Sequence, residues 1–164
     1  MKRLAIILTV IAAFYQISSA QEVGIRLGNA YTGYVSLDLV WEFDAGKVQT
    51  ESSSKSLIDL KQILRPKRIH SDMTFLNHVF SADALCDFIY APVLSDNLYC
   101  YAGPGVMVYI GNGFQFWLAG EAGLEYRFAK VPLALGADWC PAATLNDGLT
   151  MNFFRLGVNL RYVF

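Results

Sequence analysis

The residues of this chain that could carry chemistry are charged side chains set two positions apart, and His70 with Asp72 is the clearest pair. A histidine beside a carboxylate can act in general acid–base catalysis. No serine or cysteine nucleophile is placed with this pair by its spacing, because Ser71 would point to the opposite face of a strand. The pair is therefore predicted to belong to a hydrogen-bonded network, and no enzyme activity is predicted.

The same spacing extends over most of the chain and places a larger set of charged residues on one face. Apart from the histidine, every base in this set is arginine, which forms two-point pairs with carboxylates. Such pairing suits an enclosed network, because an unpaired buried charge is costly. Acids outnumber arginines, so a hydrated slot or cation path is the alternative to a closed network. The predicted network consists of Arg26, Asp38, Glu42, Arg68, His70, Asp72, Asp83, Asp87, Glu121, Glu125, Arg127, Asp138, Arg155 and Arg161.

The elements that would position these residues are strands, because apolar and polar residues alternate with a period of two. The alternation predicts eight strands, over residues 23–29, 34–43, 68–76, 79–90, 98–110, 113–128, 131–140 and 152–164. Most connections are short turns, and the longest, about 44–67, follows the second strand. Within it, residues 54–65 have helical spacing, so either a short amphipathic helix or a flexible polar loop is expected there.

Proline interrupts the fifth predicted strand. Pro104 lies between Gly103 and Gly105. Because proline has no backbone N–H to donate to a neighbouring strand, this position predicts a bulge or kink in the sheet.

Four of the predicted strands end in the same way, with two aromatic residues separated by one other residue. Aromatics two positions apart share one face of a strand. They close the second, fourth, sixth and eighth strands, which run in the same direction, so all should lie at one level. A ring of outward aromatics is the girdle of a membrane β-barrel. The predicted girdle consists of Trp41, Phe43, Phe88, Tyr90, Tyr126, Phe128, Tyr162 and Phe164.

The sequence divides into a predicted signal peptide, residues 1–20, and a predicted barrel domain, residues 21–164. Residues 1–20 have the pattern of a cleaved secretory signal peptide: a positive start, an apolar run too short to span a membrane, and a small-residue cleavage site. Residues 21–164 are predicted to form one barrel domain. Localisation to the outer membrane of a Gram-negative cell envelope is expected.

The overall composition is apolar for an exported protein. The formal net charge is −1 and the mean hydropathy is +0.34, yet no apolar run of spanning-helix length follows the signal peptide. A closed barrel is the main alternative for a membrane protein, because lipid tolerates no unpaired backbone groups. The charge balance gives no hint of a nucleic-acid partner. No phosphate loop, CxxC pair or HExxH motif occurs, so neither a cofactor nor a metal site is predicted.

The small, odd number of cysteines argues against a disulfide-stapled secreted domain. If the hairpin between the fourth and fifth strands turns over 92–97, Cys86 and Cys100 lie almost opposite each other on the outer face. Two interpretations stay open: a cross-strand disulfide, or two small lipid-facing thiols.

Together these features resemble the small eight-stranded outer-membrane barrels of the OmpA transmembrane-domain and OmpX type. The most specific element is the final run Leu156-x-Val158-x-Leu160-x-Tyr162-x-Phe164. The resemblance implies an all-β, eight-stranded antiparallel up-and-down transmembrane β-barrel. It also implies outer-membrane lipid and the barrel-assembly machinery, through the C-terminal strand, as partners of a monomer. The long connection after the second strand departs from the family, which has a short periplasmic turn there.

The expected role is structural, surface-interacting or that of a narrow conduit. One alternative is a secreted, lipocalin-like binding barrel, in which the apolar face would be the core. Large aromatics at strand ends and arginines on the charged face favour the membrane form. The last alternative is a lipid-modifying enzyme, for which His78 with Ser81 is the nearest approach to a catalytic pair.

Overall fold

The computed structural model describes residues 20–28, 35–43, 66–76, 78–111, 113–144, 146 and 148–164. Almost all of the predicted signal peptide and the whole predicted loop helix lie outside these residues. No helix within the described ranges is long and apolar enough to cross a membrane. The strands are β1 (Glu22–Gly28), β2 (Val35–Glu42), β3 (Arg68–Leu76), β4 (Val79–Asp87), β5 (Ile89–Val93), β6 (Ser95–Ile110), β7 (Phe114–Arg127), β8 (Leu133–Trp139), β9 (Ala142–Thr144), β10 (Thr150–Asn152) and β11 (Leu156–Val163).

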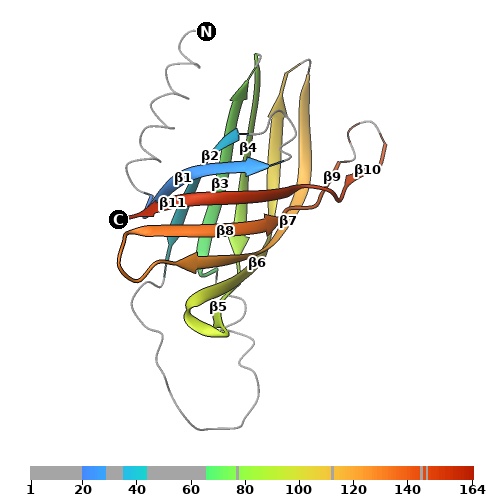
Figure 1. The fold of residues 1–164 in the computed structure, drawn as a ribbon. Coiled ribbons are helices and arrows are strands. Elements are labelled where there is room, and N and C mark those ends of the chain that lie inside the picture. The colour runs from blue at the N-terminus through green and yellow to red at the C-terminus, as the bar shows by residue number, and fades with distance from the viewer. Residues whose placement is uncertain are drawn as a thin grey trace, which may run out of the picture.

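The strands close into a barrel. Eight of them pair in the antiparallel ring β7–β8–β11–β1–β2–β3–β4–β6, and β6 pairs again with β7. The three short strands extend this ring: β5 pairs with β6, β9 with β7, and β10 with β9. Figure 1 shows the tilted ring, with β1 and β11 side by side. The predicted all-β fold and eight-stranded antiparallel up-and-down barrel are confirmed.

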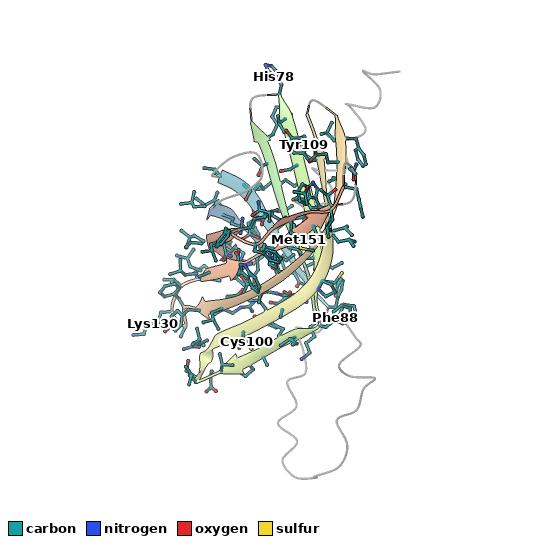
Figure 2. The ribbon with its side chains drawn as sticks, turned by 90° about the vertical axis from the view of Figure 1, so that its right-hand side faces the viewer. His78, Phe88, Cys100, Tyr109, Lys130 and Met151 are labelled. Carbon is teal, nitrogen blue, oxygen red and sulfur yellow. The ribbon has the colours of Figure 1, made fainter. Side chains whose placement is uncertain are left out.

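The described chain termini lie at one end of the barrel, and two hairpins lie at the other. The backbone N–H of Phe164 donates to the carbonyl of Gln21 at 2.9 Å, so both described termini meet at one end, which we call the terminal end. The β3–β4 and β6–β7 hairpins rise at the other, the hairpin end (Figure 1). His78 is at the tip of the β3–β4 hairpin (Figure 2).

Strand β11 shows why the sequence forms this wall. Leu156, Val158 and Leu160 are exposed on the outside, whereas Asn159 and Arg161, which alternate with these residues, are buried. Side chains of a strand point alternately to its two faces, so one face is apolar and outward while the other is polar and inward. The barrel is therefore inverted relative to a soluble one, with the apolar face outside.

Strand β6 runs through Pro104 without the predicted break, and the irregularity of the sheet lies on the facing strand instead. Leu85 pairs with Gly105, but the next pair of the same two-stranded ladder is Ile89 with Ala102, so the register shifts by one residue. Strand β4 ends there, and Phe88 separates it from β5. The shift is a bulge, and it inverts the alternation: Ile89 is exposed where an inward residue was due.

The turn after β5 is tighter than the predicted 92–97 loop. Val93 pairs with Ser95 around Leu94, whose φ is 61°. Cys100 consequently lies opposite Ala91, and Cys86 lies opposite Ile69 of β3. Val93 pairs with Ser95 but Pro92 pairs with Tyr99, so the register shifts by three residues beside the turn, and this shift moves Cys100 away from Cys86. Of the two interpretations, the disulfide is wrong: all three cysteines, Cys140 included, are free thiols.

Candidate functional site

The charged side chains predicted to form a network do gather inside the barrel. Most are buried, and the exceptions are Glu42 and Arg127, whose side chains are 12% and 26% exposed. The network divides into a layer at the terminal end, built around Glu125, and a layer at mid-height, built around His70.

Glu125 of β7 is the centre of the terminal layer. Arg68 donates to it from β3 at 2.8 Å, Arg127 at 2.7 Å, and Arg161 reaches it from β11. Tyr90 adds a hydroxyl hydrogen bond at 3.1 Å. Strands β3 and β11 do not neighbour β7, so the bonds from Arg68 and Arg161 run through the lumen and tie together strands that do not pair with each other.

The remaining carboxylates of this layer complete the pairing of the arginines. Asp87 accepts from Arg68, Glu42 accepts from Arg127, and Glu22 binds both Arg127 and Arg161. Glu22 was missed by the sequence analysis, which began the first strand one residue later. Its alternation with the inward Gly24 and Arg26 was the signal that could have found it.

Tyrosine rings support the arginines of the terminal layer. The guanidinium of Arg68 lies 4.6 Å from the ring centre of Tyr90 and 4.2 Å from that of Tyr101. Tyr90 also stacks on Tyr99, with ring centres 4.9 Å apart, and both rings lie 5.6 Å from the guanidinium of Arg127. A cation over an aromatic face is attracted by the ring quadrupole, so these tyrosines stabilise buried arginines.

Tyr90 therefore corrects the predicted girdle. It was expected outside, but the bulge at Phe88 inverts the alternation and turns it into the lumen. Trp41 and Phe88 are half-buried. The other predicted girdle residues are exposed on the outer face: Phe43, Tyr126, Phe128, Tyr162 and Phe164.

His70 is the centre of the mid-height layer. Its Nε2 lies 2.8 Å from Asp38 Oδ1 and its Nδ1 lies 2.8 Å from Glu121 Oε2, with all three side chains fully buried. Asp72, the predicted partner, lies beside these side chains, but the two hydrogen bonds of the imidazole go to Asp38 and Glu121. One potential ligand atom each of Asp38, His70 and Asp72 lies within 4.8 Å of the others.

Asp72 is held by its own neighbours. Ser36 donates its hydroxyl to Asp72 Oδ1 at 3.2 Å, and Arg26 Nε lies 3.4 Å from Asp72 Oδ2. The backbone N–H of Asp72 donates to Asp83 at 2.7 Å. Asp83 in turn faces Arg155 at 3.7 Å, a long ion pair.

Asp138 completes the layer as the main partner of Arg26. The guanidinium Nε donates to Asp138 Oδ1 at 3.0 Å, and Asn159 donates to Oδ2 at 3.0 Å. The thiol of Cys140 donates to the same carboxylate at 3.3 Å.

Toward the hairpin end the buried interior contains a cluster of uncharged side chains. Met107 and Trp117 lie directly opposite each other on β6 and β7, and both pack with Ala142. These three are buried and uncharged. Neither Met107 nor Trp117 belongs to the interior network that the sequence predicts.

His78 and Ser81, the nearest approach to a catalytic pair in the sequence, lie in different surroundings. His78 is exposed at its turn, whereas Ser81 is buried in the wall of β4. Within the described residues, the interior is a set of ion pairs in which carboxylates outnumber the arginines and the histidine, and only some of these pairs join strands that are not neighbours.

Comparison of the chain with protein-family models, curated proteins and solved structures found no match.

Proposed function

We propose that this protein is an integral outer-membrane β-barrel whose lumen is closed by ion pairs, serving as a membrane-anchored structural or surface-interaction protein. The observation that carries this proposal is the inversion of the two faces. Charged side chains are enclosed and large apolar ones are outside, the reverse of a soluble barrel.

The outer face supports a lipid environment. Exposed large apolar residues occur on most strands of the ring. Examples are Ile25 on β1, Leu118 on β7, Leu135 on β8 and Leu160 on β11. A soluble monomer rarely exposes contiguous apolar patches beyond a few hundred Å². Lipid removes that difficulty, and the closed ring leaves its strands with no open edge for lipid to meet.

The aromatic residues support one membrane level. Tyr126 with Phe128 and Tyr162 with Phe164 form edge-to-face pairs at the terminal end, with ring centres 5.1 Å apart in each pair. Aromatic girdles mark the interfaces of membrane barrels. We therefore propose that the terminal end lies at the periplasmic interface and that the hairpin end faces the cell exterior.

The cross-lumen contacts favour a scaffold over a conduit. Bonds from Arg68 and His70 on β3 to Glu125 and Glu121 on β7 reach past two intervening strands, and the bond from Arg161 on β11 to Glu125 reaches past one. An open water-filled path would separate these side chains. Planar-bilayer recordings should accordingly show no discrete current steps; steady unitary steps would favour the conduit.

The experiment that tests the membrane assignment is fractionation followed by electrophoresis. The full chain should reach the outer-membrane fraction and migrate faster before boiling than after it, because a folded barrel resists detergent. If residues 21–164 stay folded and monodisperse in buffer without detergent, the proposal fails.

A soluble, lipocalin-like barrel is the second candidate, and the charged interior argues against it. Such a barrel would use its apolar face as the ligand-binding core. Here the described interior is filled by carboxylates and guanidiniums that bind one another.

A further inference from the structure

We propose that the barrel interior binds one divalent metal ion of the zinc class through Asp38, His70 and Asp72. The inference goes beyond the proposed function and does not depend on it, because it concerns the inner face alone.

The register of the sheet assembles the three ligands. Asp38 of β2 and Asp72 of β3 lie directly opposite each other, and His70 is two residues before Asp72 on the same inward face. One potential ligand atom from each lies within 4.8 Å of the other two. Ligand atoms about 2.0–2.2 Å from a tetrahedral zinc ion stand roughly 3–4 Å from one another, so the cluster needs little adjustment.

Glu121 gives the histidine the orientation that a metal ligand requires. It lies 2.8 Å from Nδ1 of His70, across the lumen on β7, and is itself buried. A ligating histidine usually binds a carboxylate through its second ring nitrogen, which fixes the ring and its tautomer. With Nδ1 held by Glu121, Nε2 points toward the two aspartates.

The aspartates also offer oxygen atoms that nothing satisfies. Asp38 Oδ2 and Asp72 Oδ2 are buried and have no hydrogen-bond partner among the residues that the structure describes. Their arginine neighbours are at 3.7 Å for Arg161 and 3.4 Å for Arg26, beyond good hydrogen-bond distance. Two carboxylates directly opposite on neighbouring strands repel each other, and a dication between them removes that repulsion.

The mixed ligand set selects the class of metal. Magnesium and calcium prefer sites made of oxygen, whereas imidazole nitrogen suits zinc and its neighbours. Three protein ligands leave one position for water in a four-coordinate zinc ion. Binding replaces the proton between Nε2 and Asp38, and that proton leaves to solvent.

The test uses the mature chain, refolded from urea into detergent micelles with zinc chloride and then desalted. Bound zinc is counted by elemental mass spectrometry, and folding is checked by heat-modifiable migration. Wild type should retain about one zinc per barrel. His70→Gln and Asp72→Asn should retain almost none, and Glu121→Gln should weaken binding about 10- to 100-fold.

His78→Asn is the matched control, because His78 is the second of the chain's two histidines and is exposed at a turn. This variant should keep its zinc. Loss of zinc from His78→Asn but not from His70→Gln would overturn the proposal, as would a folded wild type that retains none.

X-ray absorption of the zinc-loaded wild type keeps the proposal testable if the variants do not fold. The spectrum should show one imidazole nitrogen among oxygen ligands; an all-oxygen shell would overturn the assignment. A barrel that inserts into membranes yet retains no zinc after loading would refute this inference and leave the proposed function intact.

Discussion

The terminal and hairpin halves of the lumen are filled in different ways by the same wall. In the terminal half, Glu125 binds arginines from strands on other sides of the ring. In the hairpin half, Met107 packs against its direct neighbour Trp117. The charged half is thus held by ion pairs, several of which reach beyond adjacent strands, whereas the apolar cluster of the hairpin half packs between adjacent strands. The charged half should therefore depend on the chemistry of its side chains, and the apolar half on their volume.

The largest effect should follow loss of the central carboxylate. Glu125→Gln keeps the shape but leaves buried arginines without their anion, which should cost about 3–5 kcal/mol of unfolding free energy. Urea unfolding in lipid vesicles measures it. Glu42→Gln, at a partly exposed position of the same layer, should cost less than about 1 kcal/mol. Equal losses of unfolding free energy at the two positions would contradict the central role of Glu125.

The apolar half should respond to volume instead. Met107→Ala should cost about 2–4 kcal/mol, because it leaves a cavity beside Trp117, whereas Met107→Leu should cost less than about 1.5 kcal/mol. The same unfolding measurement applies. A near-isosteric change that is as costly at Met107 as at Glu125 would contradict the difference between the halves.

The smallest effect concerns the tyrosine that the bulge turns inward. Tyr90→Phe removes the hydroxyl that donates to Glu125 and should cost about 1 kcal/mol. Tyr162→Phe, on the outer face, is the matched control and should cost less. If the two changes cost the same, Tyr90 does not serve the charged half.

Alternation predicted which face each side chain occupies, and it did so well. The predicted charged residues are inside, but the irregularity predicted at Pro104 lies on the facing strand. Face follows from local spacing alone, since side chains of a strand alternate. The orientation of Tyr90 was wrong because the bulge opposite Pro104 changed the phase within one strand.

Partners were harder to predict than faces. The spacing pointed His70 to Asp72, whereas the structure gives it Asp38 and Glu121 from two other strands. The opposed placement of Cys86 and Cys100 failed for a related reason, since the register shifts between Pro92 and Val93, beside the turn. Contacts across a lumen depend on how the ring closes, which no local pattern encodes.

The measurement that tests the inverted barrel most directly is quenching of tryptophan fluorescence by brominated lipid acyl chains. Two single-tryptophan proteins serve: one keeps Trp139, exposed on the outer face of β8, and the other keeps Trp117, buried inside. Phenylalanine replaces the remaining tryptophans. The account predicts strong quenching of Trp139 and little of Trp117. Unquenched Trp139, or Trp117 quenched as strongly, would contradict it.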